Sequence, residues 1–199
     1  MSGKRFASSR FVLRSYPARE EVQYFAESLG WVVASTEKKA PPFSGTEIIW
    51  SSSGGEALRY MEDEMTGNCY VTVEASTGEE VQRLGEAVVD ELLPWEREEL
   101  VFAVDTASDE MEFGLAVIRL SIAAPRRTDE TILQRVRSAL THDDARVRDM
   151  GIVATTYSPW PEYVPLLRDI AQGDSEHKLR ERSRSVLESY AAAGVGEDE

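Results

Sequence analysis

The sequence predicts an α+β protein, in which a small antiparallel or mixed sheet with two helices is followed by a stack of α-helical hairpins. Short β-branched runs alternate with two amphipathic segments in the first half, whereas the second half shows only helical spacing. A turn motif also recurs there after about thirty-two residues. We therefore expect an α+β domain over residues 1–107, a helical-repeat domain over 108–193 and a disordered acidic tail over 194–199.

The first fifty residues are expected to form three short strands and one helix. Runs rich in β-branched and aromatic residues predict the strands at 11–16, 31–34 and 47–50. Between the first two strands, apolar residues recur every three to four positions after Pro17, and Gly30 provides a helix stop. A polar loop is expected to separate the second and third strands.

A hairpin and a second helix are expected next. Residues 57–65 and 69–75 are strand-like and flank 66–68, where a glycine can supply a positive φ. Thr77 and Glu80 have the spacing of a capping box, so an amphipathic helix is expected to begin there and to end at Pro94. The apolar run at 100–104 is predicted to be the last strand.

From about Ser108 onward the pattern predicts helices alone. Ser108 is a candidate cap for a helix whose inner stripe is Met111, Leu115, Ile118 and Ile122, although apolar alternation leaves a strand open for residues 108–123. Short turns should make the following helices antiparallel neighbours. These further helices are expected at about 129–141, 143–157, 161–173 and 176–192.

The recurring turn motif carries a family resemblance. Residues 136–148 run from Ala-Leu through Asp-Asp to Val-Arg, and a degraded copy over 167–180 ends in Leu-Arg. This motif resembles the turn inside a HEAT repeat, so residues 108–192 are similar to HEAT-repeat-like bacterial proteins, which include proteins of the immunity type. The resemblance implies that Asp143 or Asp144 caps the second helix and that Arg148 turns back onto the repeat. Residues 1–107 resemble no family that we recognise.

The net charge of −14 is concentrated in one segment. Residues 56–112 contain 3 Lys/Arg against 17 Asp/Glu, whereas residues 1–55 contain 7 against 5 and residues 113–199 contain 12 against 14. Such a field repels phosphate backbones and anionic lipids but attracts a basic partner. We therefore expect a basic protein partner, and neither direct nucleic-acid binding nor membrane binding.

Other features indicate a cytoplasmic protein. The amino-terminal residues contain no apolar core of a secretory signal, and no window approaches the roughly 20 apolar residues of a membrane span. Cys69 is the single cysteine, which excludes an internal disulfide and fits a reducing compartment. Because it begins a strand and has no basic neighbour, Cys69 is expected to be a buried packing residue.

Candidate partner-binding residues are clustered carboxylates and one tryptophan flanked by prolines. These residues are Glu62, Asp63, Glu64, Glu96, Glu98, Glu99 and Trp160. A solvated face that aids solubility is the competing interpretation of the carboxylates. The run 142–144 is expected to be a capping turn rather than a metal site, and no catalytic residue, metal or cofactor is predicted.

The leading hypothesis is an inhibitor or immunity-type protein that neutralises a toxin or effector by binding its basic surface. A regulatory or scaffold HEAT-repeat adaptor fits the same features. The alternative from another class is a hydrolase or lyase that uses an inter-domain cleft, with Glu62, Glu64 or Asp143 as acid/base groups. The partner, the oligomeric state and the binding face of the helical stack stay open at this point.

Overall fold

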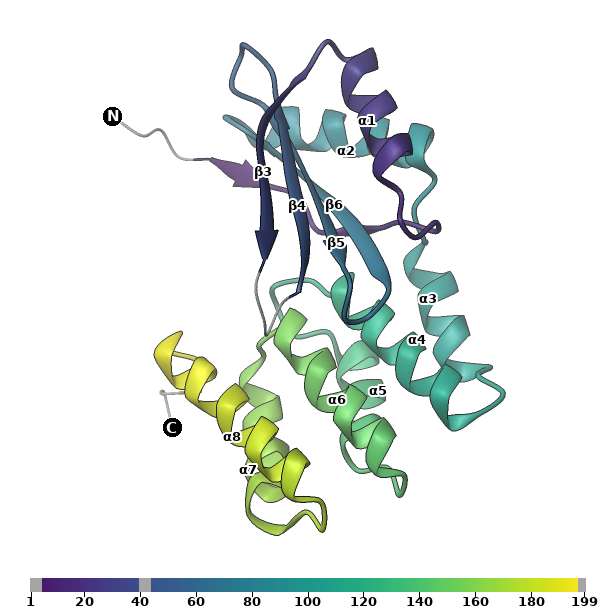
Figure 1. Ribbon diagram of the computed structural model, residues 1–199, viewed down its shortest axis with the longest axis vertical. Helices are drawn as coiled ribbons and strands as arrows, with labels where there is room; N and C mark the ends of the chain where they lie inside the picture. The colour runs from purple at the N-terminus through teal and green to yellow at the C-terminus, as the bar shows by residue number, and fades with distance from the viewer. Residues whose placement is uncertain (1–4, 40–43, 197–199) are drawn as a thin grey trace. The chain divides into compact units, whose positions relative to one another are not determined.

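The computed structural model describes residues 5–39 and 44–196 (Figure 1). The chain divides into two compact units, Met1–Glu96 and Arg97–Glu199. The first unit combines a sheet with helices and the second is helical, as expected for the predicted α+β layout. The division lies before the predicted boundary at 107/108, because the segment predicted to be the last strand is a helix of the second unit.

The first unit contains a six-stranded antiparallel sheet in the order β1-β6-β5-β4-β3, and β2 also pairs with β6. The predicted hairpin around residues 66–68 is confirmed, and Gly67 has a φ of 64°. The predicted strand at 31–34 continues as β3 to Lys39, which pairs with Gly45. Residues 40–43 of the predicted polar loop lie outside the described residues. The strands are β1 (Phe6–Ala7), β2 (Phe11–Val12), β3 (Val32–Lys39), β4 (Gly45–Ser51), β5 (Ala57–Asp63) and β6 (Asn68–Ala75).

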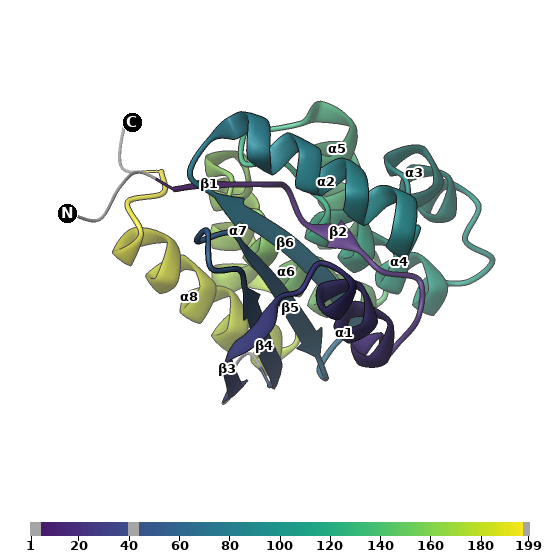
Figure 2. The same ribbon diagram turned by 90° about the horizontal axis from the view of Figure 1, so that it is seen from above.

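Two helices pack on one face of this sheet and bury the core of the first unit. Helix α1 (Arg19–Ser28) contacts β5, and α2 (Gly78–Leu92) contacts β6 and runs beside the β1–β2 segment (Figure 2). Alternate residues of the strands face these helices, including Trp50, Leu58 and Val71. Period-two burial on one face is the pattern of a sheet with a single core side.

The capping box that begins α2 is confirmed. The Thr77 hydroxyl accepts from the Glu80 amide at 3.2 Å, and the Glu80 carboxylate accepts from the Thr77 amide at 3.1 Å. Both bonds satisfy amides that a helix start leaves without an intrahelical acceptor.

Replacing Thr77 with alanine is expected to lower the free energy of unfolding by about 1 kcal/mol, because the Glu80 amide loses its acceptor. Urea denaturation of the purified chain measures this difference. Ser76→Ala is the matched control, since Ser76 is exposed and precedes the cap. Equal effects of the two substitutions would contradict the capping role.

The predicted strand at 100–104 is wrong, since these residues lie within α3 (Arg97–Asp105). Leu100 and Val104 are buried one helical turn apart, whereas Phe102 between them is 67% exposed. In a strand, Leu100, Phe102 and Val104 would lie on the same face, so a strand buried on both faces would have buried all three residues. Glu98 and Glu99 in the first turn also favour a helix start, because carboxylates there offset the positive end of the helix dipole.

Residues 110–122 form helix α4 (Glu110–Ile122), so the strand left open for this segment is excluded. Its cap is Asp109 rather than the predicted Ser108, and the Asp109 carboxylate accepts from the Glu112 amide at 2.8 Å. The predicted inner stripe is correct only at its carboxyl-terminal end, where the helix is buried on several sides. Met111 and Leu115 are 39% and 38% exposed.

The four later helices occupy the predicted positions, and the second unit consists of the hairpins α3/α4, α5/α6 and α7/α8. Between α5 and α6 the backbones approach closely, since a Cβ on Gly151 would lie 2.9 Å from the Leu140 amide nitrogen. No helix within the described ranges is both long and apolar enough to cross a bilayer. The elements are α5 (Glu130–Leu140), α6 (Ala145–Tyr157), the 3-10 turn η1 (Pro161–Tyr163), α7 (Val164–Gly173) and α8 (His177–Ala192).

The predicted roles in the α5/α6 turn are confirmed. Asp144 is the residue that caps α6, and its carboxylate accepts from the Arg146 amide at 2.8 Å. Arg148 turns back onto the turn, where its Nη1 donates to the carbonyl oxygens of His142 at 2.7 Å and Asp143 at 2.8 Å. His142 Nδ1 accepts from the Asp144 amide, so this run is a capping turn as predicted.

The α7/α8 turn repeats this arrangement thirty-two positions later in the sequence. Arg180 Nη1 donates to the carbonyl oxygens of Asp174 at 2.5 Å and Ser175 at 3.0 Å, the same offsets that Arg148 uses. Arg148 also joins the two hairpins, because its Nε and Nη2 donate to the Asp174 carboxylate. The recurrence inferred from sequence is therefore a recurrence of hydrogen bonding.

The predicted disordered tail does not begin at residue 194. Residues 194–196 form a turn after α8, in which the Val195 amide donates to the Tyr190 carbonyl at 2.9 Å. Gly194 and Gly196 have φ values of 71° and 80°, which glycine adopts without strain. The rest of the predicted tail, 197–199, lies outside the described residues.

Candidate protein-binding groove

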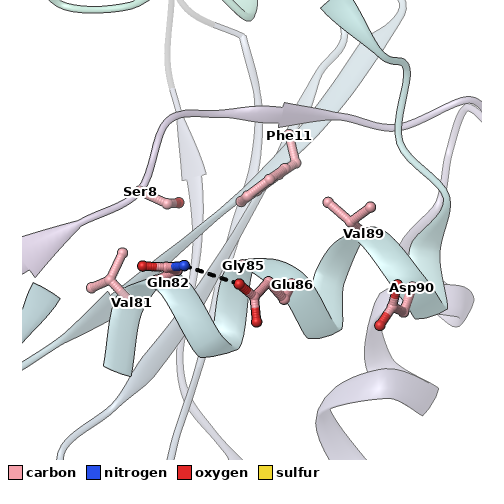
Figure 3. Close-up of a pocket in the computed structure, with 8 residues that line it drawn as sticks. All are labelled: Ser8, Phe11, Val81, Gln82, Gly85, Glu86, Val89 and Asp90. Carbon is pink, nitrogen blue, oxygen red and sulfur yellow. Dashed lines mark hydrogen bonds between the residues drawn. The ribbon is translucent and has the colours of Figure 1, made fainter. Parts of the chain in front are cut away.

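An open groove of about 540 Å³ lies between the β1–β2 segment and helix α2 in the first unit (Figure 3). Its apolar residues come from both elements, whereas its carboxylates come from α2 alone. The lining residues are Ser8, Phe11, Val81, Gln82, Gly85, Glu86, Val89 and Asp90.

Helical spacing places the apolar lining on one stripe of α2. Val81, Gly85 and Val89 follow one another at four-residue intervals, which puts them on one side of a helix. Gly85 admits the neighbouring aromatic ring, because a Cβ at that position would lie 3.2 Å from Phe11 Cζ. Val89 is 44% exposed, so the floor of the groove offers apolar surface to a ligand.

A polar stripe runs beside the apolar one, and it is acidic. Gln82 Nε2 donates to Glu86 Oε1 at 3.1 Å, which orients the Glu86 carboxylate, and Asp90 follows one turn later (Figure 3). Helix α2 as a whole carries five acidic residues and a single basic residue, Arg83. The groove therefore combines an apolar floor with a negative rim.

The chemical groups that line the groove are apolar, hydroxyl, amide and carboxylate side chains. The groove contains no histidine, cysteine or lysine that could act as a base or nucleophile beside its carboxylates. Within the part of the chain that the structure describes, no cluster of three or more His, Cys, Asp or Glu side chains could hold a metal ion.

The carboxylates predicted at residues 62–64 have three different environments. Asp63 is only 6% exposed, and its Oδ1 accepts from the amides of Met65 and Thr66, so it stabilises the β5–β6 turn. Glu62 is half-buried and accepts from the Tyr60 hydroxyl at 3.2 Å. Glu64 is exposed. Of these three residues, only Glu64 has the exposed carboxylate that the predicted acidic binding face requires.

Glu62 also lines a second hollow of about 440 Å³, together with the chain that leads into α1. Glu20 and Glu21 contribute carboxylates to it and Arg19 contributes a guanidinium. Asp143, the other acid/base candidate, is exposed in a turn of the second unit, where its carbonyl binds Arg148.

The predicted acidic segment 56–112 is divided between the two units. Glu96 is exposed and ends the first unit, whereas Glu98 and Glu99 belong to α3 in the second. Glu98 is exposed and Glu99 is half-buried. The carboxylates predicted to act together are therefore distributed over two separate bodies.

Trp160, a predicted partner-binding residue, is buried in the structure. Its side chain is 2% exposed, stacks on the Tyr163 ring at 5.5 Å between centroids, and donates from Nε1 to the Pro125 carbonyl at 3.3 Å. The indole therefore fills the interior of the helical unit, with its N–H satisfied by a backbone carbonyl.

Cys69 is a packing residue, as predicted. Its side chain is fully buried, and Sγ donates to the Ser15 carbonyl at 3.0 Å. Burial raises the pKa of the Cys69 thiol, so the nucleophilic thiolate is disfavoured.

The sheet face opposite to α1 and α2 carries paired charges. Arg59 lies between Glu47, at 2.6 Å, and Glu74, at 3.3 Å, and Lys39 also reaches Glu47 at 2.8 Å. Burial opposes ionisation of Glu47, but hydrogen bonds from Lys39 and Arg59 lower its pKa overall. Because these charges neutralise one another, this face has less net attraction for an ionic partner than the groove.

The sequence contained a signal for the groove, but only a partial one. Val89 and Leu93 are apolar residues at the carboxyl-terminal end of α2, and both are exposed in the structure. Phe11 could not be assigned to the same site, because it lies far in the sequence from α2, which begins only at Gly78. Comparison of the chain with protein-family models, with curated proteins and with solved structures found no match.

Proposed function

We propose that this chain is a cytoplasmic binding protein of the inhibitor or immunity type, which occupies a basic segment of a toxin or effector with its α2 groove. One observation supports the proposal: an apolar floor and a carboxylate rim occur side by side on helix α2. A partner segment with an apolar side chain beside Lys or Arg fits both features.

In this proposal the apolar lining of the groove supplies affinity, and its carboxylates supply a high association rate and selectivity for a cationic partner. Contact with Val81, Val89 and Phe11 would remove apolar surface from water, at roughly 25 cal/mol per Å². Glu86 and Asp90 would steer a cationic segment toward the groove and disfavour an acidic one. Steering of this kind weakens as salt screens the charges.

We also propose that the second unit is a HEAT-like stack. The support is the shared hydrogen bonding of Arg148 and Arg180 to the turns before α6 and α8. Helix α3, which the sequence did not predict, provides a third hairpin with α4. Three repeats are about the number that a helical stack needs in order to be stable.

Charge reversal in the groove tests the function. The wild-type chain and a Glu86→Lys/Asp90→Lys variant are immobilised and exposed to lysate of the source organism, and recovered proteins are quantified by mass spectrometry. We expect the wild type to retain a basic protein in equimolar amount, and the variant to retain at least about tenfold less. Retention by the wild type should also fall when the salt concentration is raised.

The matched control is Glu64→Lys/Glu91→Lys, which changes the net charge equally at two exposed positions outside the groove. It should retain the partner nearly as well as the wild type. Equal loss in both variants would show that general acidity, and not the groove, holds the partner. A partner that keeps its full activity in the complex would assign the chain a scaffold or adaptor role instead of an inhibitory one.

A further inference from the structure

We propose that Arg180 is a docking point for a carboxylate that precedes a helix in a partner protein. The proposal concerns the second unit and does not depend on the α2 groove. Its basis is a carboxylate-binding geometry that the same unit already uses once, at the equivalent residue Arg148.

Arg148 divides its hydrogen-bond donors between two tasks. Its Nη1 donates to two carbonyl oxygens of its own turn, which fixes the plane of the guanidinium. Its Nε and Nη2 then donate to the two oxygens of Asp174, at 2.7 and 3.0 Å. Such a bidentate pair is among the stronger polar contacts in proteins.

Arg180 binds its own turn through Nη1 in the same way, and its Nε and Nη2 are available for a ligand. Nη1 is held by the carbonyls of Asp174 and Ser175, and no described residue accepts a hydrogen bond from Nε or Nη2. The side chain is half-buried. Because the turn already holds the guanidinium, an incoming carboxylate would lose little free energy in ordering it.

The internal precedent also indicates the kind of carboxylate. Asp174 lies in the turn before α8, where its Oδ1 additionally accepts from the Glu176 amide at 2.9 Å. The matching ligand is therefore an aspartate at the start of a partner's helix. Neighbouring side chains on α8, such as Glu181, Arg184 and Ser185, are exposed and polar. Binding should thus rest on charged hydrogen bonds rather than on apolar burial.

The probe is a fluorescein-labelled heptapeptide with the sequence of residues 171–177, which carries the Asp174 carboxylate in its own turn sequence. A second peptide differs only by asparagine in place of that aspartate. Fluorescence anisotropy with the full-length chain should show saturable binding of the aspartate peptide. The asparagine peptide should bind at least about tenfold more weakly, because an amide offers one acceptor oxygen instead of two.

Arg180→Lys separates geometry from charge, because lysine keeps the positive charge but lacks the planar fork. We expect it to weaken binding of the aspartate peptide about tenfold in a chain that still folds, as its circular dichroism spectrum shows. Arg184→Lys on the same helix is the control and should leave binding unchanged. Equal affinity of the wild type and Arg180→Lys would overturn the proposal. The proposal would also be overturned if inorganic phosphate competed with the labelled peptide and the aspartate and asparagine peptides bound equally well.

Discussion

Replacing Arg148 with alanine is expected to lower the free energy of unfolding by about 3 kcal/mol. The Arg148 and Asp174 side chains are only 15% and 4% exposed, so the substitution leaves a buried carboxylate without its cation. It also removes the donor that two turn carbonyls share. Urea denaturation followed by circular dichroism measures the loss.

The same pair predicts a pH dependence. The hydrogen bonds from Arg148 lower the pKa of Asp174 below its usual value, which is about 4 in an unfolded chain. A depressed pKa in the folded state stabilises the fold above the unfolded-state value, and this stability is lost as the pH falls through the folded-state value. The wild type should therefore lose stability below about pH 4, and Arg148→Ala should lose less over that range.

Arg146→Ala is the matched control for both measurements. Arg146 pairs with Asp144 two residues away, but its side chain is 67% exposed. Exposed pairs of this kind contribute about 0 to 1 kcal/mol, so the control should remain close to the wild type. A loss for Arg148→Ala as small as that of the control would contradict the role assigned to the pair between hairpins.

Replacing Gly45 with alanine is expected to cost about 3 kcal/mol, a large effect for the addition of one methyl group. A Cβ at this position would lie 2.0 Å from the Glu62 carbonyl oxygen, which belongs to the backbone of β5. Strand β4 is internal to the sheet, so relief requires the β4–β5 pairing to open rather than a side chain to rotate.

Gly78→Ala provides the comparison within the same unit. No atom lies within 4 Å of the Cβ that it would add, and the residue begins α2. Alanine is a better helix former than glycine, so this substitution should be neutral or slightly stabilising. Thermal denaturation of both variants tests the pair. Similar melting temperatures for the two variants would argue against the close approach of β4 and β5.

Much of the fold could be predicted because its signals are local. Capping at Thr77 and the apolar spacing of the later helices depend on residues within a few positions of one another. Errors in assignment arose where local patterns are ambiguous. The run around Phe102 is apolar enough for a strand, but its packing against α4 favours the helix. Strand β3 continues through charged residues because β4 supplies the pairing.

The site was harder to predict, because it depends on contacts that sequence spacing does not reveal. The acidic runs were visible, but the turn role of Asp63 depends on how β5 ends, and the burial of Trp160 depends on the path of the chain around Pro125. The groove requires Phe11 to meet the surface of α2 at Gly85. Neither residue has an unusual sequence context by itself.

Under the proposed function, the α2 groove binds a partner through apolar contact as well as charge. Isothermal titration of the captured partner into the wild type and a Val89→Asp variant tests this most directly. The substitution makes the groove more acidic while it removes apolar surface from a residue that is 44% exposed. We predict at least about tenfold weaker binding with an unchanged melting temperature. Equal or tighter binding by Val89→Asp would exclude an apolar contribution of the α2 groove to partner binding.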